Sequence, residues 1–381
     1  MAAPHRYVDQ AREFVRSYTD GLNVEDLRKL FDQDVSKAYK VLAQDRRLTD
    51  EPEEDLHRLL YRAKVVFLGV SEKLTPARRT IFAACILLTL IGLFNPVNFN
   101  IALRSARFSV DFSALWFTTA IAGLLYLLIV ELVDRVRVRD ELEVARHLQR
   151  DLLPQSAPPV PGYEFAHSYR TANEVGGDYH DFQLLDDGRI ALMVGDASGH
   201  GIAAGLLMAI ANATLKTAID LDPSPVQVAA VLNRALYRTG DRRAFMTLFY
   251  AVLEPATGEV EYVCAGHPFP LVRHPDGNVE ELGTGSLPLG LRPEIALESA
   301  TTRLGVGDLL ALYTDGLVEA VDGDDQAFGF ERLKALLREP AGPYTLHDRI
   351  LASFDRHVDK EPLTDDLTLV VMAATPPPPA V

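Results

Sequence analysis

Residues 189–201 read Arg-Ile-Ala-Leu-Met-Val-Gly-Asp-Ala-Ser-Gly-His-Gly, and this stretch decides how the C-terminal half of the chain is built. Its apolar first part, Arg189–Val194, predicts a buried strand. The glycine-rich part, Gly195–Gly201, follows directly, and the apolar segment Ile202–Ile219 after it predicts a helix. Such a strand presents Asp196 at the end of a sheet, where the glycines leave room for other groups to approach.

Three further acidic clusters share this design. Glu174-Val-Gly-Gly-Asp178 places a carboxylate directly after two glycines. The predicted strand Asp308–Tyr313 ends in Thr314-Asp315-Gly316, and Thr364-Asp365-Asp366 comes immediately before the predicted strand Leu367–Met372. Carboxylates at strand ends beside glycine can converge, because nothing bulky prevents close approach of the backbone. We therefore expect the four clusters to meet at one site.

A site of this kind needs cations, because several unpaired carboxylates in one place repel one another. Oxygen ligands without a nearby cysteine select the hard cations Mg²⁺ or Mn²⁺ over soft metals. Two such ions lower the pKa of a bridging water and neutralise charge that develops on a phosphoryl group. The pattern therefore predicts metal-assisted phosphoester chemistry that needs no covalent nucleophile.

Asp315-Gly316 and Gly176-Gly-Asp178 are weak signals by themselves, since Asp-Gly pairs are common turn residues. Gly195–Gly201 is stronger, because it follows a predicted strand and opens a predicted helix, and the main strength lies in the ordered set. Two histidines beside glycine are ambiguous. His200 could act as a general acid, and His267 in Ala265-Gly-His-Pro268 raises the same question. For both histidines a structural role is the favoured interpretation.

The composition sets further limits. The chain has 381 residues, enough for two or three folding units, of which 48% are hydrophobic and 24% charged. Its net charge of −15 argues against a nucleic-acid partner, which would need clustered Lys and Arg. The two cysteines, Cys85 and Cys264, support neither a disulfide framework nor a zinc site. Because the N-terminus lacks a secretory signal, we expect the working domains in a reducing compartment.

Two apolar segments predict a transmembrane hairpin. Ile81–Phe94 is uncharged, and Phe112–Val130 is about long enough to cross a hydrocarbon core of ~30 Å. Basic residues flank the pair on both outer sides, whereas the loop between holds only Arg104 and Arg107, so the positive-inside rule favours cytoplasmic ends. The expected location is the inner (plasma) membrane, multi-pass, with the N- and C-terminal regions cytoplasmic. A buried helical hairpin is the alternative.

Periodicity and proline suggest the boundaries of the other segments. Residues 1–78 predict a cytoplasmic helical region, with one helix around Leu27–Leu42, and residues 79–133 form the hairpin. Residues 134–155 predict a helical linker. The turn signals in residues 156–374 predict the catalytic domain, and Ser224 and Pro225 predict the cap and the first residue of a helix within it. The proline-rich residues 375–381 predict a disordered tail.

The charged helix Glu131–Leu153 can also serve as a dimer contact. Its apolar row is narrow enough to pair with a second copy and consists of Val138, Leu142, Ala145 and Leu152. We therefore expect a possible homodimer through residues 131–153. A passive connector is the alternative, because so short a repeat does not establish a coiled coil.

In this order the motifs resemble the type-2C, or PPM, protein phosphatases, specifically their bacterial SpoIIE-like branch. The resemblance covers about residues 140–374, and it is carried by Ala145-Arg-His-Leu-Gln149, Leu152-Leu-Pro154, Glu174-Val-Gly-Gly-Asp-Tyr-His-Asp-Phe182, Gly195-Asp-Ala-Ser-Gly-His-Gly201, Ala265-Gly-His-Pro268, Tyr313-Thr-Asp-Gly316 and Asp365-Asp-Leu-Thr-Leu369. It implies an α+β fold with a β-sandwich flanked by helices (αββα). An all-α N-terminal region with two transmembrane helices would precede it.

The resemblance also implies a protein serine/threonine phosphatase that uses two Mn²⁺ or Mg²⁺ ions. Asp196 would bridge the two ions, and the carbonyl group of Ala197 would contact one of them. Asp315 and Asp365 would hold the other ion, while Asp178 completes the site directly or through water. The catalytic residues implied are thus Asp178 and Asp196. The neighbouring Asp366 is not counted among the ligands.

Substrates of this family are phosphoserine or phosphothreonine on regulatory proteins, typically anti-sigma-factor antagonists, and a partner of that kind is expected here. Many eukaryotic members have a phosphate-binding arginine where this chain has Asn173. Arg170 is the nearest basic residue, and the phosphate contact stays unassigned.

Two other functions compete with this interpretation. Gly176-Gly-Asp178 superficially resembles the loop of diguanylate cyclases, but that function would leave the later Asp-Gly and Asp-Asp motifs without a role. A membrane-tethered pseudophosphatase that only binds its partner is the non-enzymatic alternative. All the expected carboxylates are present, so the sequence gives loss of catalysis no support.

Overall fold

The computed structural model describes residues 55–94, 98–103, 106–111, 113–239, 244–283, 285–359 and 361–376. The chain splits into two compact units, Met1–Val136 and Arg137–Val381. The expected helix around Leu27–Leu42 lies outside the described residues, and so does the tail from residue 377 onward.

The first unit contains long helices and a short hairpin. The elements in chain order are the helices α4 (Asp55–Lys73) and α5 (Pro76–Phe94), the strands β1 (Asn98–Leu103) and β2 (Ala106–Asp111), and the helix α6 (Ser113–Leu152). The two strands pair antiparallel, so the loop expected between the apolar segments contains a β-hairpin. The second apolar segment and the charged linker are one continuous helix of 40 residues, α6, which crosses the boundary between the two units.

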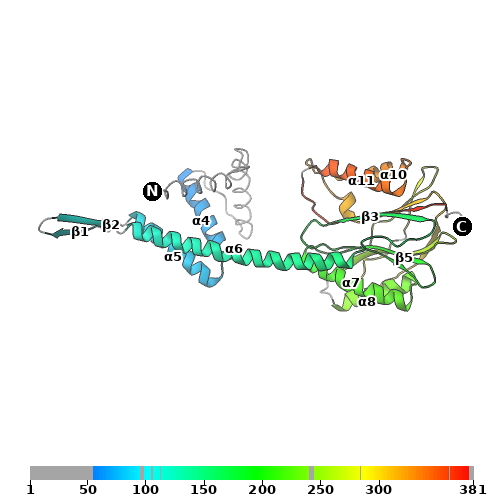
Figure 1. Cartoon of the computed structure of the whole chain (residues 1–381), viewed down its shortest axis with the longest axis horizontal. Coiled ribbons are helices and arrows are strands. Elements are labelled where there is room, and N and C mark those ends of the chain that lie inside the picture. Colours follow the sequence, from blue (N-terminus) through cyan, green and yellow to red (C-terminus); the bar gives the residue numbers. More distant parts are fainter. Residues whose placement is uncertain are drawn as a thin grey trace, which may run out of the picture. The chain divides into compact units, whose positions relative to one another are not determined.

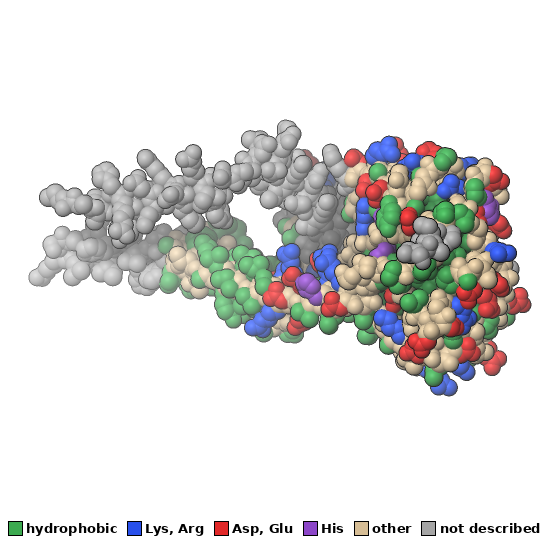
Figure 2. Space-filling model, turned by 45° about the vertical axis from the view of Figure 1, so that its right-hand side comes forward, with side chains coloured by type: hydrophobic (Ala, Val, Ile, Leu, Met, Phe, Trp, Pro, Cys, Tyr) green, Lys and Arg blue, Asp and Glu red, His purple; other side chains and the backbone are tan. Residues whose placement is uncertain are grey.

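Three helices are long and apolar enough to cross a membrane: α5, α6 and α7 (Ile202–Leu221). In α5 and α6 only 11% of the most apolar window is buried inside the protein, whereas in α7 the share is 50%. Hydrophobic side chains accordingly gather on the helical unit in Figure 2, and charged side chains are interspersed over the C-terminal unit. The buried face of α7 belongs to the core of the C-terminal unit.

Helices α5 and α6 pack through small residues and one cation. A Cβ atom at Gly123 would overlap Sγ of Cys85, which is 3% exposed. Near the start of α5, Arg78 forms ion pairs with Glu131, at 3.1 Å, and with Asp134 of α6. Close backbone approach and these ion pairs fix the register of the two helices.

The second unit contains two five-stranded antiparallel sheets. Their orders are β10-β7-β6-β5-β4 and β3-β12-β11-β8-β9. The strands are β3 (Tyr163–Arg170), β4 (Asp178–Leu184), β5 (Ile190–Ala197), β6 (Met246–Glu254), β7 (Glu259–Ala265), β8 (Leu271–Arg273), β9 (Val279–Glu281), β10 (Ala300–Arg303), β11 (Leu309–Tyr313) and β12 (Leu367–Ala374).

Helices cover both outer faces of the sheet pair. The first sheet carries α7 and α8 (Pro225–Thr239), and the second carries α10 (Phe330–Arg338) and α11 (Pro343–Val358). Figure 1 shows α10 and α11 on one side of the sheets and α7 and α8 on the other. This confirms the αββα sandwich, and Pro225 begins α8 as expected.

Strand burial follows from the four layers. In β5, Ala191 and Met193 point to the helices, whereas Ile190, Leu192 and Val194 point to the other sheet. Alternate side chains of a strand face opposite sides of the sheet. Both faces of this sheet are covered, so β5 is apolar throughout instead of alternating.

The α5–α6 contact gives a first prediction. Replacing Gly123 with Leu should overpack the contact with Cys85 and lower the free energy of unfolding by about 1–3 kcal/mol. The thermal midpoint of the full chain in detergent micelles, followed through the fluorescence of its single tryptophan, Trp116, measures this. The matched control is Ala122→Leu at an exposed position, and equal midpoints for the two variants would contradict the packing argument.

Candidate functional site

Four aspartates from both sheets lie at the same end of the sandwich. Asp178 is the first residue of β4 and pairs with Asp196 near the end of β5. In the second sheet Asp315 opens the short helix α9 (Asp315–Val318) just after β11, and Asp365 precedes β12, the neighbour of β11. The structure therefore brings together the four carboxylates that the sequence predicts at one site.

Two threonines orient the buried carboxylate of Asp178. Its Oδ2 accepts hydrogen bonds from the hydroxyl groups of Thr314 and Thr368, each at 2.7 Å. The backbone N–H of Thr368 donates to the hydroxyl oxygen of Thr314 at 2.9 Å, which leaves the proton of that hydroxyl for Asp178. Burial, followed by the negative charge of Asp196, raises the pKa of Asp178 well above its usual range.

A second chain of hydrogen bonds fixes the backbone at Asp196. Its N–H donates to Oγ1 of Thr247 at 3.2 Å, and the Thr247 hydroxyl group lies 2.8 Å from Nδ1 of His267. Burial lowers the pKa of His267 to about 3, so its neutral ring can accept the threonine proton. The structure thus gives His267 the structural role that the sequence analysis favours.

Adjacent aspartates have different surroundings. Asp366 is 5% exposed; its Oδ1 accepts from the N–H of Ala172 at 2.8 Å and its Oδ2 from the N–H of Gly177 at 2.5 Å. Asp365 is exposed. Partial burial and the negative charge of Asp315 raise the pKa of Asp365. Both carboxylate oxygens of Asp366 therefore accept hydrogen bonds from backbone N–H groups. Of the two aspartates, Asp365 is the one whose pKa the charge of Asp315 raises.

Close backbone approach at this end depends on two glycines. A Cβ atom at Gly177 would lie 2.6 Å from the carbonyl oxygen of Ala197, and the Ala197 N–H donates to the Gly177 carbonyl at 3.2 Å. A Cβ atom at Gly316 would overlap the carbonyl oxygen of Asp366. Any side chain at these positions would push the loops apart and separate the carboxylates.

A glutamine from α6 holds the same loop. The side-chain amide of Gln149 donates to the carbonyl oxygen of Gly176 at 2.5 Å, and its Oε1 accepts from the Gly176 N–H at 3.0 Å. Gln149 is 4% exposed, so both bonds are shielded from water. The turn that precedes Asp178 is thus tied to a helix on one side and to Asp366 on the other.

The electrostatics of this end favour a bound cation. Burial, followed by the charges of Asp315, Asp365 and Asp366, raises the pKa of Asp196 to about 8. Burial, followed by the charge of Glu319, raises that of Asp315, whose Oδ1 is buried without a hydrogen-bond partner among the described residues. A cation would relieve the repulsion and occupy this oxygen.

The donor set also fits the expected ions. The candidate ligands are oxygens only: the carboxylates of Asp178, Asp196, Asp315 and Asp365, with the carbonyl group of Ala197 beside them. This donor chemistry suits Mg²⁺ or Mn²⁺. Within the described ranges, no three His, Cys, Asp or Glu side chains could hold a metal ion as they now stand.

Two basic candidates have other surroundings. Arg170 pairs with Asp355 of α11, with Nη2 at 3.3 Å from Oδ2, so its guanidinium group is already engaged. His200 is exposed, and its charge lowers the pKa of Asp365, opposing the effect of burial. Arg170 is therefore not a candidate for the phosphate contact. His200 lies close enough to influence the charge of the site.

Sequence reasoning missed the residues that orient the carboxylates. Thr247 lies in none of the motifs, and Thr314, Thr368 and Gln149 stand in motifs without a role of their own. The available signal was their position: Thr314 directly precedes Asp315, and Thr368 follows Asp366 by two residues. Neither of these positions in the sequence shows that the threonine hydroxyl groups donate to Asp178.

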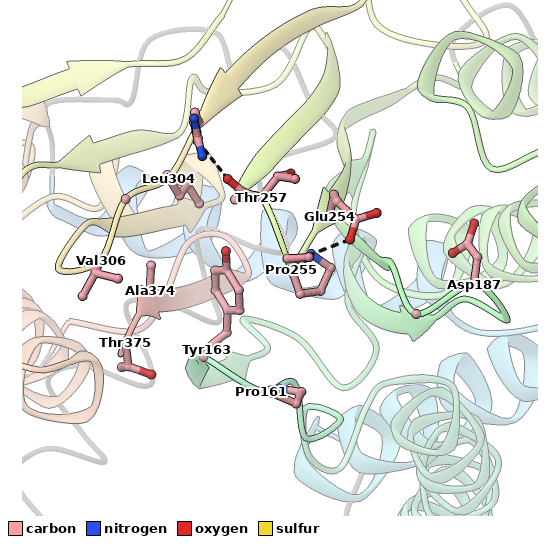
Figure 3. A pocket seen from close by; sticks show the side chains of 16 residues that line it. Pro161, Tyr163, Asp187, Glu254, Pro255, Thr257, Leu304, Val306, Ala374 and Thr375 are labelled. Carbon is pink, nitrogen blue, oxygen red and sulfur yellow. Dashed lines mark hydrogen bonds between the residues drawn. The ribbon is translucent and has the colours of Figure 1, made fainter. Parts of the chain in front are cut away.

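One pocket lies at the opposite end of the strands. It has a volume of about 750 Å³, and Figure 3 shows Asp187, Glu254 and Thr257 around it, from the β4–β5 and β6–β7 turns. Arg303 Nε donates to the Thr257 carbonyl there at 2.8 Å. None of the four aspartates lines this pocket, so its size does not make it the candidate active site.

Comparisons with known proteins agree with the geometry. Residues 186–375 match the family described as "Stage II sporulation protein E (SpoIIE)", a range that includes Asp196, Asp315 and Asp365. Phosphoserine phosphatase RsbP of Bacillus subtilis is 27% identical over 244 residues, covering 62% of this chain and 59% of the relative. The chain spans about half the length of the curated relatives it matches.

Solved structures show the same fold. The RsbU and RsbW domains of Rv1364c from Mycobacterium tuberculosis align with a TM-score of 0.51 and 28% identity, over 60% of this chain and 64% of that one. The SiaA-PP2C domain of Pseudomonas aeruginosa aligns with a TM-score of 0.57 and 21% identity, over 63% of this chain and 98% of that domain.

The Gln149 contacts give a second prediction. Replacing Gln149 with Leu leaves the buried N–H and carbonyl groups of Gly176 unpaired, so Mn²⁺ affinity should fall by about 10- to 100-fold. Calorimetric titration with Mn²⁺ measures the affinity, and circular dichroism checks the fold. The control is Gln155→Leu, whose exposed amide makes one long bond of 3.4 Å. Unchanged Mn²⁺ affinity in both variants would show that the Gly176–Gly177 turn keeps its conformation without Gln149.

The raised pKa of Asp196 gives a third prediction. Its carboxyl group is mostly protonated at pH 7 and must lose the proton to bind a cation, so Mn²⁺ affinity should rise with pH between 6 and 8. The gain should reach up to about tenfold per pH unit for one released proton. Calorimetry in buffers of different ionisation enthalpy counts the protons. A pH-independent affinity would refute the raised pKa.

Proposed function

Because the C-terminal unit of this chain carries a PP2C-type phosphatase domain of the SpoIIE-like branch, we propose that the chain hydrolyses phosphoserine or phosphothreonine on a regulatory protein. The observation that carries the proposal is the convergence of Asp178, Asp196, Asp315 and Asp365 at one end of the sandwich, where burial is the main cause that raises the pKa of each. Carboxylates gathered in this way either keep a proton or bind a cation.

The proposed roles follow from the surroundings of each residue. Asp196 would be shared between two ions, because Asp178 pairs with it in the first sheet and the charges of Asp315 and Asp365 reach it from the second. Asp315 and Asp365 would hold one ion, and the Ala197 carbonyl group would contact an ion from the β5 side. Asp178 would complete the site, its orientation held by Thr314 and Thr368. Two bound Mn²⁺ or Mg²⁺ ions supply an activated water and neutralise charge on the phosphoryl group.

The substrate class comes from the relatives. RsbP and RsbU of Bacillus subtilis are named phosphoserine phosphatases, and the structural neighbour from Mycobacterium tuberculosis joins RsbU and RsbW domains in one chain. We assign this chain a phosphorylated anti-sigma-factor antagonist as its partner. A pseudophosphatase that only binds the partner would retain the fold but has no reason to keep four carboxylates together at one end of the sandwich.

The same proposal places the chain in a membrane. α5 and the apolar part of α6 would form the two spans, with the N-terminal region and the C-terminal unit on the cytoplasmic side. A homodimer through residues 131–153 would pair the apolar row of Val138, Leu142 and Ala145 with a second copy, and Val138 in this row is 56% exposed. Leu152 would not take part, because it packs against the core of its own unit.

A turnover assay tests the activity. The full chain in micelles should hydrolyse p-nitrophenyl phosphate and a phosphoserine peptide with Mn²⁺ or Mg²⁺, and excess EDTA should stop both reactions. Asp196→Asn should remove nearly all turnover because two ions lose a shared ligand. Asp187→Asn, an exposed change at the opposite end of the strand pair, is the control. Full activity in EDTA, or equal activity of the two variants, would exclude the proposed reaction.

Thiol labelling tests the topology. Cysteine introduced at Asp111, at the end of β2, should react with a membrane-impermeant thiol reagent in intact cells. Cysteine introduced at Glu298 of the C-terminal unit, which is exposed, should react only after lysis. Both native cysteines are buried and give a low background. The reverse labelling pattern would reverse the orientation.

A further inference from the structure

A second pocket adjoins the candidate active site. It has a volume of about 580 Å³ and lies where the β7–β8 loop, β11, α9 and α10 meet. Asp315 lines it, so an occupant of this pocket would extend directly to the carboxylates described above. Its glutamates, its lysine and the ring of Phe330 belong to none of the sequence motifs, and the proposed reaction does not account for them.

Aromatic rings form part of its lining. They belong to Phe269, Tyr313 and Phe330. The Tyr313 hydroxyl group donates to the Phe269 carbonyl at 3.0 Å, and the rings of Tyr313 and Phe330 meet edge to face with centroids 6.4 Å apart. Phe330 is 48% exposed, so its ring is open to an incoming group. Rings of this kind attract cations that lie over their faces.

Negative charge is in excess on the remaining walls. Three glutamates, Glu281, Glu319 and Glu331, line the pocket, against one cation, Lys334. Lys334 Nζ lies 2.6 Å from Glu281 but 3.9 Å from Glu331, whose side chain is 86% exposed. Glu319 is also exposed. Lys334 therefore neutralises Glu281, and Glu319 and Glu331 are available to an incoming positive charge.

We propose that this pocket binds a lysine or arginine side chain of the phosphoprotein substrate, at a position close to the phosphorylated residue. The proposal rests on the proposed phosphatase function and adds a sequence preference to it. Both a carboxylate pair and an aromatic wall favour a cation over an apolar or acidic side chain. An extended chain advances about 3.3–3.6 Å per residue, so a side chain one to three residues away reaches a pocket that borders Asp315.

A peptide series tests the proposal on the full chain in micelles. Phosphoserine peptides with an alanine background carry a single lysine, or its uncharged counterpart norleucine, at each of three positions on either side. For at least one position the ratio of kcat/KM between the lysine and norleucine peptides should reach about fivefold at low salt, as for a favourable exposed charge pair. High salt should reduce this ratio.

Variants assign the preference to the pocket. The ratio should fall toward one in the double variant Glu319→Gln/Glu331→Gln, and Glu331→Lys should favour glutamate peptides instead. Glu259→Gln is the control, since Glu259 starts β7 and lies about 20 Å along the strand from the pocket. Comparing ratios removes any general effect of a substitution on turnover. A ratio of one at every position, or a preference that survives the double substitution, overturns the proposal.

Failure of the reaction itself would give a different result. If no phosphoester is hydrolysed, the proposed function fails, and binding of the same peptides with a fluorescent label, measured by anisotropy, still decides the pocket. Tighter binding of a lysine peptide that is lost in the double variant supports the cation pocket. Equal binding of lysine and norleucine peptides overturns it.

Discussion

Repulsion between buried like charges is the constraint on which the C-terminal unit depends. Asp178, Asp196 and Asp315 are brought to one end of two sheets, and burial raises the pKa of each. A carboxylate removed from water costs free energy unless hydrogen bonds or cations compensate. The surrounding structure provides rigid backbone and directed hydroxyl groups, and it leaves the net negative charge for ions to balance. A site of this kind exchanges stability for affinity toward cations.

The groups that hold the carboxylates in place come from elements that are distant in the chain. The Gly176–Gly177 turn receives Gln149 from α6 and Asp366 from the loop before β12. Thr314 and Thr368 hold Asp178 from the second sheet. Each contact crosses between layers, so the three hydrophobic cores position the site as well as stabilise the fold.

Much of this architecture could be predicted from local patterns. The apolar strand Ile190–Val194, the helix after Gly201 and the proline that begins α8 are all encoded within a few neighbouring residues. Helix α11 is not among the elements expected from the sequence, although its buried residues recur at helical spacing, at Leu346, Ile350, Phe354 and Val358. The contacts of Asp178 with Thr314 and Thr368 span 136 and 190 residues, and a single sequence does not encode such pairs. The same limit explains Asp366, because a carboxylate that binds backbone groups cannot be told from a ligand by spacing alone.

The position of β12 has a consequence for how the protein is made. This strand follows all the other strands in sequence, yet it lies inside its sheet, between β3 and β11. During synthesis β3 and β11 therefore lack the strand that pairs with both of them. Their unpaired backbone N–H and C=O groups stay exposed until β12 leaves the ribosome. The loop that carries Asp365 and Asp366 arrives with the same segment. The acidic site is thus completed only when β12 joins its sheet, and a nascent chain whose β12 is still inside the ribosome lacks both the closed sheet and Asp365, one of the four candidate carboxylate ligands.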